Sequence, residues 1–372
     1  MVSGREWVRA DLPGPGTAPD PEGDLLLLGP DGAPGAALGR ENRVLAAELG
    51  GRLLRRAGLA RGDRVAVALS AEGDQSGTLV AEAATAAEAR AAVVGPRGRM
   101  RLHAALEAMR ATALVATPCG AADLLARLHM EFQADPLDLG LRRILLAGEV
   151  APDTLRRRLA AEFGAEVGDL FIDPLLQVPV AHRPFGAEGA EGFEPARPGM
   201  IGLAPLDADT LDEPPYPAGT AEVVTVPDWH PALRGTVVRT GFTAAPAAGA
   251  AAVPAPSGTV GERVLVRGRW LSLPRLEREL ARIDGIGAWE LRVSRPGTLD
   301  LAELRVAFAR ASLIGDRMWT ARIDQALASF SPVRIAVAVE EEARDEGGAG
   351  RLTDERGHHL ARERGGARAR AG

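Results

Sequence analysis

The sequence predicts an α/β protein with two domains: a large N-terminal domain on a mainly parallel sheet flanked by helices, and a small ferredoxin-like C-terminal domain. From residue 64 to residue 164, short apolar strands alternate with segments of helical periodicity. From 263 to 340, the order strand, helix, strand, strand, helix, strand is the ferredoxin-like βαββαβ unit. The length of 372 residues is sufficient for two or three domains.

The large domain is predicted from a regular alternation of elements. Residues 41–58 carry apolar side chains at helical spacing and end at Gly58. We expect strands at 64–69, 91–95, 113–118 and 142–149, and helices at 101–110, 121–132 and 152–164. Parallel strands connected by helices bind their ligand beyond the carboxyl ends of the strands.

The domain boundaries are predicted from changes in composition. Short strands between Gly- and Pro-rich turns fill 185–256, and AAPAAGAAAVPAPSG at 244–258 has the composition of a flexible connector. The predicted units are a leader at 1–24, the large domain at 25–256, a lid-like domain at 257–343 and a Gly/Arg-rich tail at 344–372. The basic end from Arg351 is interpreted as a solvated tail, with a polyanion-binding arm as the alternative.

Composition excludes several functions. The net charge of −6 and the pI near 5.7 argue against a nucleic-acid or membrane partner. Cys119 is the single cysteine, which excludes an intrachain disulfide and fits a cytoplasmic protein. The start of the chain shows no apolar signal core, and no apolar run approaches the roughly 18 residues needed to span a bilayer. All 44 basic residues are arginine, so lysine-dependent chemistry such as Schiff-base formation is excluded.

A glycine loop lies in the stretch LLLLGPDGAPGAALG at 25–39. An apolar strand, a glycine loop and a following helix would form a cradle for phosphate. The loop contains Pro30, Asp31 and Ala33, and no Ser, Thr or Lys. We therefore predict the shape of a phosphate loop without its chemistry; without any family to compare, the glycine signal is weak and favours a plain turn.

Several segments together resemble phenylacetate-CoA ligases, a branch of the adenylate-forming (AMP-binding) superfamily. These segments are ALVATP, DPLDLGLRRILLAGEVAPDTLRRRLAAEFGAEV, VVRTG, VLVRG and LPRLERELARIDGIG, in that order along the chain. The resemblance implies a large domain, a hinge and a mobile C-terminal lid. It also implies joining of ATP to an aryl-acetate or similar acid as an acyl-adenylate, followed by transfer to coenzyme A. Family members usually carry a further N-terminal subdomain, which this chain is expected to lack.

The family's functional motifs are altered at the matching positions. Its loop S-S-G-T-T-G-K-P aligns with LLGPDGAP, and its Y-G-x-T-E, with the Mg²⁺ carboxylate last, aligns with FIDPL at 171–175. Its ribose-binding R-T-G-D aligns with RTGF at 239–242, its hinge G-R with Gly258-Thr259, and its lid E-G-K with EGG at 346–348. The resulting degenerate nucleotide-site positions are Gly29, Asp31, Gly32, Asp173, Pro174, Leu175, Arg239, Thr240, Phe242 and Gly348.

Two classes of function are consistent with these residues. The leading hypothesis is a catalytically impaired member of this family that acts as a binding or partner protein. Its expected partner is a small acyl or aryl ligand or an active paralogue, and a homodimer is one expected assembly. It has no catalytic residue, cofactor or metal site. The alternative is an enzyme: either a divergent acyl- or aryl-CoA ligase that requires ATP, Mg²⁺ and CoA, or one that transfers acyl groups without ATP.

Four residues are candidates for a residual ligand pocket: Glu149, His182, Arg239 and Arg267. The alternative role of Glu149 is a structural hydrogen bond. The alternative role of Arg239 and Arg267 is to form ion pairs between the domains. A further candidate for the pocket is His230 in its loop, whereas Cys119 is interpreted as a buried packing residue. The remaining histidines are interpreted as ordinary surface or tail residues, not metal ligands: His103, His129, His358 and His359.

Overall fold

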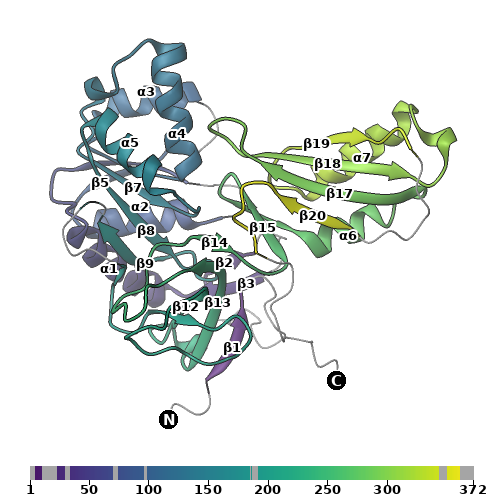
Figure 1. Cartoon of the computed structure of the whole chain (residues 1–372). Coiled ribbons are helices and arrows are strands. Elements are labelled where there is room, and N and C mark those ends of the chain that lie inside the picture. Colours follow the sequence, from purple (N-terminus) through teal and green to yellow (C-terminus); the bar gives the residue numbers. More distant parts are fainter. Residues whose placement is uncertain are drawn as a thin grey trace.

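The computed structural model describes residues 5–10, 23–29, 34–69, 74–95, 99–184, 186, 192–342 and 350–360. Figure 1 shows a large lobe that contains the N-terminal elements and a small lobe that contains the C-terminal ones. Each lobe has its own buried core: one hydrophobic core is formed by residues between 264 and 352, and the others lie in the large lobe, where Leu265 and Trp270 of the small domain also pack. In the described part of the chain, no helix is long and apolar enough to cross a membrane.

A seven-stranded sheet forms the centre of the large domain. Its strands are β4 (Arg64–Ala68), β5 (Arg90–Val93), β6 (Ala113–Ala116), β7 (Arg143–Ala147), β8 (Glu166–Ile172), β9 (Pro179–Pro184) and β10 (Glu194–Pro195). The order across the sheet is β10-β9-β8-β7-β6-β4-β5. Strands β5, β4, β6, β7 and β8 are parallel, which confirms the predicted α/β class. The last two strands, β9 and β10, run antiparallel to their neighbours.

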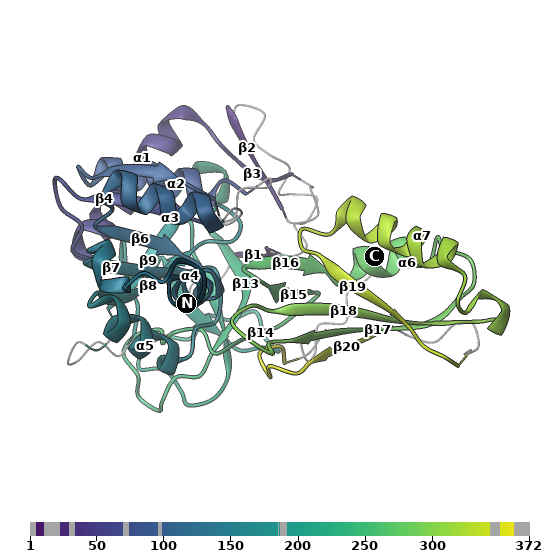
Figure 2. The same ribbon diagram turned by 90° about the horizontal axis from the view of Figure 1, so that it is seen from above.

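Helices cover both faces of this sheet (Figures 1 and 2). The described helices of the large domain are α1 (Arg40–Arg56), α2 (Ser76–Ala86), α3 (Arg99–Met109), α4 (Pro118–Arg127) and α5 (Asp153–Phe163). Helices α1 and α2 share a core with Val65 and Val67 of β4. Helices α3, α4 and α5 share another core with Ala66 and Ala68 of the same strand. Burial on both faces explains why β4 is a continuous apolar run.

A second sheet of the large domain packs beside the first. Its strands are β1 (Glu6–Arg9), β11 (Ile201–Ala204), β12 (Ala221–Thr225), β13 (Thr236–Ala244) and β14 (Gly258–Thr259). The order is β1-β13-β12-β11, with β14 on β13. Strand β1 lies within the predicted leader at 1–24 but pairs in parallel with β13, and its Val8 is buried in the core. This part of the leader therefore belongs to the large domain.

The glycine loop joins two strands and does not lead into a helix. Strands β2 (Leu25–Leu28) and β3 (Pro34–Leu38) form an antiparallel hairpin, and α1 begins only at Arg40. The expected strand–loop–helix arrangement is wrong for this segment. The sequence after the loop is Ala-rich, which favours a helix locally, but pairing with β2 buries Ala36, Ala37 and Leu38 instead.

The small domain contains the predicted elements in the predicted order, with two further strands, β16 and β20, and a different strand pairing. Its elements are β15 (Arg263–Val266), β16 (Arg269–Ser272), α6 (Leu273–Leu280), β17 (Ile286–Ser294), β18 (Leu301–Phe308), α7 (Arg317–Phe330), β19 (Ile335–Val339) and β20 (Arg351–Asp354). The sheet order is β19-β18-β17-β20, and β15 pairs with β16 as a separate hairpin. Helices α6 and α7 lie on one face of the sheet (Figure 2).

Two local features explain this difference from a ferredoxin-like sheet. Arg267 and Gly268 have φ of 51° and 71°, as the two-residue loop of a type I′ hairpin requires, so β15 turns back onto β16. The free edge of β17 is then occupied by the parallel strand β20, whose Leu352 packs on the small-domain core. Residues 351–360, expected in a solvated tail, are therefore part of the structure.

Candidate ligand-binding site

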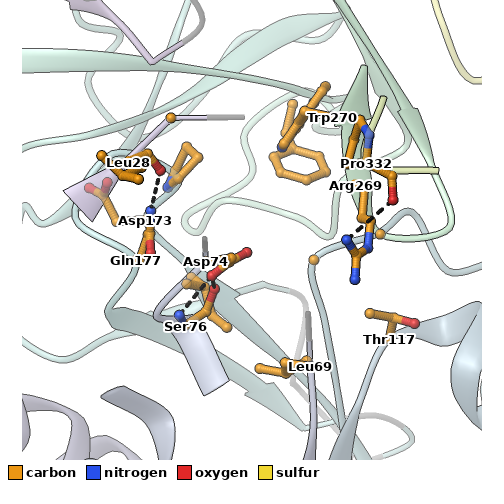
Figure 3. A pocket seen from close by; sticks show the side chains of 16 residues that line it. Leu28, Leu69, Asp74, Ser76, Thr117, Asp173, Gln177, Arg269, Trp270 and Pro332 are labelled. Carbon is orange, nitrogen blue, oxygen red and sulfur yellow. Dashed lines mark hydrogen bonds between the residues drawn. The ribbon is translucent and has the colours of Figure 1, made fainter. Parts of the chain in front are cut away.

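A small cavity lies beyond the carboxyl ends of β4, β6, β7 and β8, at the edge where the sequence predicted a ligand site. We call it the aromatic cavity; its volume is about 200 Å³ (Figure 3). Large-domain residues surround most of it, and the β15–β16 hairpin closes it from the small domain. Its lining includes Leu28, Leu69, Asp74, Thr117, Ile172, Asp173, Gln177, Phe242, Gly268, Arg269, Trp270 and Pro332.

Phe242 and Trp270 form the aromatic wall. Phe242 is buried, and its ring meets Trp270 edge-on at 5.1 Å between centroids. Phe171 packs edge-on against Phe242 from the other side, at 5.8 Å. The position at which the resemblance places a ribose-binding carboxylate therefore presents an apolar ring to the cavity. Such a wall favours an apolar or aromatic ligand group.

Asp173 caps a turn beneath the cavity. Its Oδ1 accepts hydrogen bonds from the backbone N–H groups of Leu175 (2.8 Å) and Leu176 (2.9 Å), and its Oδ2 accepts one from the Thr225 hydroxyl. Burial raises the pKa of the Asp173 carboxyl above its usual value. Leu175, which aligns with the family's metal-binding carboxylate, is buried in the core, and Pro174 lines the cavity. Across the described residues, no three His, Cys, Asp or Glu side chains cluster as a metal site would require.

A second, larger cavity adjoins the first. It has a volume of about 440 Å³, and we call it the arginine cavity because Arg127, Arg267, Arg269 and Arg334 line it. Among the described residues of its lining, Asp123 is the one acidic residue. Arg127 is paired with Asp123 and Glu131, whereas Arg334 is exposed and forms no ion pair with the described residues. The cavity therefore carries a net positive charge, which suits an anionic ligand group.

Thr117, Arg269 and Pro332 line both cavities, so the two cavities are neighbours that meet at these three residues, which we call the junction. Thr117 ends the β6 segment and caps α4 by accepting a hydrogen bond from the N–H of Gly120 at 3.1 Å. Arg269 donates to the carbonyl of Pro332 at 3.2 Å (Figure 3).

Glu149 lies behind the junction as a buried acid. Its Oε2 accepts a hydrogen bond from the backbone N–H of Cys119 at 2.8 Å, and its Oε1 has no hydrogen-bond partner among the described residues. Burial, reinforced by the charge of Asp300, raises the pKa of Glu149 to about 7. Glu149 thus makes the structural hydrogen bond considered as the alternative to a pocket role.

Cys119 lines the arginine cavity but is buried. Burial, together with the charges of Glu149 and Asp300, raises the pKa of its thiol well above the usual value. A thiol in this state is a poor nucleophile, which agrees with the packing role predicted from the sequence.

The other predicted pocket residues lie at different distances from these cavities. Arg267 lines the arginine cavity, and its backbone N–H donates to Asp300 Oδ2 at 3.0 Å. Arg239 is buried in β13 and pairs with Glu222 and Asp209, each at 2.8 Å, so its ion pairs lie within the large domain and not between the domains. Thr240, next to it, donates its hydroxyl to the carbonyl of Val223 at 2.6 Å. Neither residue lines either cavity.

The two buried histidines of the large domain also lie outside both linings. His182 is in β9, where burial lowers the pKa of its ring to about 4. His230 is held by the carbonyl of Ala37 at 2.8 Å from its Nε2. Of the glycine loop, Gly29 lines the aromatic cavity, whereas Asp31, Gly32 and the lid position Gly348 lie outside the described residues.

Sequence reasoning missed the residues that come from distant segments. Arg269, Trp270, Pro332 and Arg334 reach the site from the small domain, and nothing in their local sequence marks them. Thr117 carried a usable signal, because a Thr followed by Pro between a strand and a helix is a typical N-cap at a ligand-binding sheet edge.

Gly268 allows the hairpin to approach the large domain closely. A Cβ at this position would lie 2.8 Å from Thr117 Cγ2 and 3.2 Å from Glu149 Oε1, and φ is 71°. We expect Gly268→Ala to lower the free energy of unfolding by about 1–3 kcal/mol, measured by urea denaturation. Gly297→Ala is the matched control, because no atom lies within 4 Å of its Cβ position. Equal stabilities of the two variants would contradict this close packing.

The chain has the fold of adenylate-forming enzymes. It superposes on a 2-hydroxyisobutyryl-CoA ligase in complex with 2-HIB-AMP and CoA with a TM-score of 0.68, at 18% identity over 88% of this chain and 70% of that chain. The Bacillus subtilis o-succinylbenzoate CoA synthetase gives 0.62, at 13% identity over 84% and 65%. The Vibrio cholerae adenylation domain AlmE gives 0.61, at 14% identity over 86% and 64%. No family model and no curated protein matches the sequence.

Proposed function

We propose that this chain is a degenerate member of the phenylacetate-CoA ligase branch that binds a small acyl or aryl group carried on a phosphate-bearing thiol such as coenzyme A, without activating acids with ATP. The observation that carries the proposal is the pair of neighbouring cavities, one small and aromatic, the other larger and lined by four arginines. We expect it to act as a binding protein in the cytoplasm.

The aromatic cavity suits the acyl or aryl group. Its volume of about 200 Å³ is somewhat larger than the ~150 Å³ in which an engineered apolar cavity holds benzene. Phe242 and Trp270 supply faces and edges for an aromatic ring. Thr117 and Gln177 add a few polar groups that can orient the ligand.

The arginine cavity suits the phosphate-bearing carrier. Guanidinium groups bind phosphate through charge-assisted, often bidentate hydrogen bonds. The cavity meets the aromatic one at Thr117, Arg269 and Pro332, so a thioester placed there would have its acyl group on one side and its carrier on the other. Two of the similar structures support this arrangement: the 2-hydroxyisobutyryl-CoA ligase holds CoA in its thioesterification state, and the o-succinylbenzoate CoA synthetase holds OSB-NCoA.

The residues at the expected nucleotide contacts weigh against ATP. An apolar ring at position 242 offers no acceptor to ribose hydroxyls, and the oxygens of Asp173 already accept three hydrogen bonds. Removal of one transition-state contact typically costs about 10²–10³ in rate, and here several are absent from the sequence together, although such losses are not additive.

Ligand-induced stabilisation tests the proposal. We expect phenylacetyl-CoA to raise the free energy of unfolding by about 2.7 kcal/mol at 100 times its Kd, and ATP–Mg²⁺ and AMP to leave it unchanged. Phenylacetyl-CoA serves as the probe because it combines an aromatic acyl group with a phosphate-bearing thiol. Thermal unfolding and calorimetric titration provide the readouts.

Arg334→Gln separates specific phosphate binding from general charge effects. We expect it to weaken phenylacetyl-CoA binding by about tenfold, the size of one charge-assisted hydrogen bond. Arg157→Gln removes an equal charge from the exposed surface of α5, away from both cavities, and should change binding little. Stabilisation by ATP–Mg²⁺, with ATP–pyrophosphate exchange on addition of phenylacetate, would defeat the proposal in favour of a divergent ligase.

A further inference from the structure

Within the residues that the structure describes, the chain passes between the two domains twice. It leaves the large domain after β14 and enters the small domain at β15, so residues 260–262 make the first passage. After β20 has joined the small-domain sheet, residues 355–360 return to the large domain. A single connection leaves a domain free to rotate about it, whereas two connections side by side restrict that rotation.

The returning segment is bonded to the outgoing one at Thr259. The N–H of Thr259 donates to the carbonyl of His358 at 2.6 Å, and the N–H of Leu360 donates to the carbonyl of Thr259 at 3.0 Å. The Thr259 hydroxyl lies 3.1 Å from His359 Nδ1. Since β14 also pairs with β13, the segment is attached to the second sheet of the large domain by one parallel bridge, between His359 and Thr259.

The turn between β20 and this segment is fixed by Asp354. Its Oδ1 accepts from the N–H of Arg356 at 3.1 Å, and its Oδ2 accepts from the N–H of His359 at 3.0 Å. Arg356 also bonds Asp354 through its guanidinium, and only 5% of its side chain is exposed. The two ends of the returning segment are therefore held at a set separation.

Arg356 connects this turn to the hairpin that closes the site. It pairs with Asp300 at 2.7 Å and donates to the carbonyl of Leu265 in β15 at 2.8 Å. Asp300 in turn accepts from the backbone N–H of Arg267, in the hairpin loop. The contacts thus run without interruption from the returning segment to the wall of the arginine cavity.

We propose that residues 351–360 form a strap that holds the small domain in one orientation and thereby keeps the β15–β16 hairpin against the binding site. Its members are positioning residues, because they act on the ligand through the hairpin. The effect on ligand binding rests on the function proposed above, whereas the restraint on the domains does not.

Leu360→Pro in the full-length protein tests the strap. Proline removes the N–H that bonds Thr259, and the Leu360 side chain is half exposed, so little packing is lost. Leu360→Ala, which keeps the N–H, is the matched control. We expect amide hydrogen exchange in 257–262 to rise about tenfold in Leu360→Pro and to stay unchanged in Leu360→Ala. Small-angle X-ray scattering should show a broader ensemble for the proline variant alone.

Gly258→Ala disturbs the same contact by another route. Its Cβ would lie 2.7 Å from the His358 carbonyl oxygen, which pushes the strap away from β14. If Leu360→Pro proved unfolded by circular dichroism, this variant would carry the test. The strap would be overturned if the folded variants showed the same amide exchange rates and the same small-angle scattering as Leu360→Ala.

Binding of phenylacetyl-CoA separates the two proposals. If both hold, the folded strap variants bind it at least about fivefold more weakly than Leu360→Ala does. If the strap variants exchange faster but the wild-type protein does not bind phenylacetyl-CoA, the strap is supported and the proposed function is rejected. Unchanged affinity despite faster exchange would overturn the positioning role.

Discussion

Replacing Asp300 with alanine is expected to lower the free energy of unfolding of the small domain by about 3–5 kcal/mol. Asp300 is 1% exposed, and its two carboxylate oxygens pair with Arg295 and Arg356, both at 2.7 Å. It also accepts the backbone N–H of Arg267. Its removal leaves Arg295 without this partner and takes one of two carboxylates from the buried Arg356, which still pairs with Asp354. The N–H of Arg267 also loses its acceptor, and these losses together are the source of the large effect.

Urea unfolding followed by tryptophan fluorescence measures this loss, because Trp289 and Trp319 belong to the small domain. Glu303→Ala on the neighbouring strand β18 is the control. Glu303 pairs with Arg305 at 3.4 Å and both side chains are about one third exposed, so its loss should cost less than about 1 kcal/mol. If Asp300→Ala were as stable as Glu303→Ala, Asp300 would not organise the small domain.

The parallel sheet of the large domain could be predicted because its signals are local. Strands β4, β6 and β7 are apolar runs bounded by turn residues, and the helices between them show their own periodicity. Because both faces of these strands are buried, the strands have few alternative registers and few alternative kinds of neighbouring element. The position of the cavity followed from this sheet, since it lies beyond the same strand ends.

The elements that the sequence did not show depend on partners far along the chain. Strand β20 is only Arg351–Asp354, in a basic, Gly-rich context, and it exists because β17, about 60 residues earlier, offers a free edge. Strand β3 is Ala-rich, and its pairing with β2 outweighs its helical propensity. Short strands of this kind carry too little local preference to be recognised alone.

The candidate site shows the same division. Positions in the large domain, such as Asp173 and Phe242, could be assigned by alignment of motifs, although their contacts could not. The turn Arg267-Gly268 was predicted only as the end of a strand, and its insertion between Thr117 and Glu149 depends on how the domains are placed. Residues that reach a site from another domain have no signal in their own sequence window.

The contribution of Glu149 to the stability of the protein should fall as the pH rises from about 4.5 to about 7, opposite in sign to that of His182, whose pKa burial lowers to about 4. Burial raises the pKa of Glu149 from its usual value of 4.5 to about 7 in the folded chain. Between these values the folded state holds a proton that the unfolded chain has released, so the folded state binds more protons and each rise in pH favours unfolding. The full shift corresponds to about 3 kcal/mol, reached near pH 7.

Glu149→Gln should remove this dependence, because the amide stays neutral and its oxygen can still accept the N–H of Cys119. The difference in unfolding free energy between variant and wild type, measured in urea at pH 5, 6, 7 and 8, should therefore increase with pH and level off above pH 7. Glu213→Gln in an exposed loop controls for the loss of one negative charge elsewhere. A difference that stays constant over this range would show that Glu149 is ionised throughout. If Glu149 is ionised, its Oε1, which has no partner among the described residues, would require a cation or a hydrogen-bond donor from the facing β15–β16 hairpin. The close approach of Gly268 alone would then no longer explain the tight packing of the hairpin against the large domain.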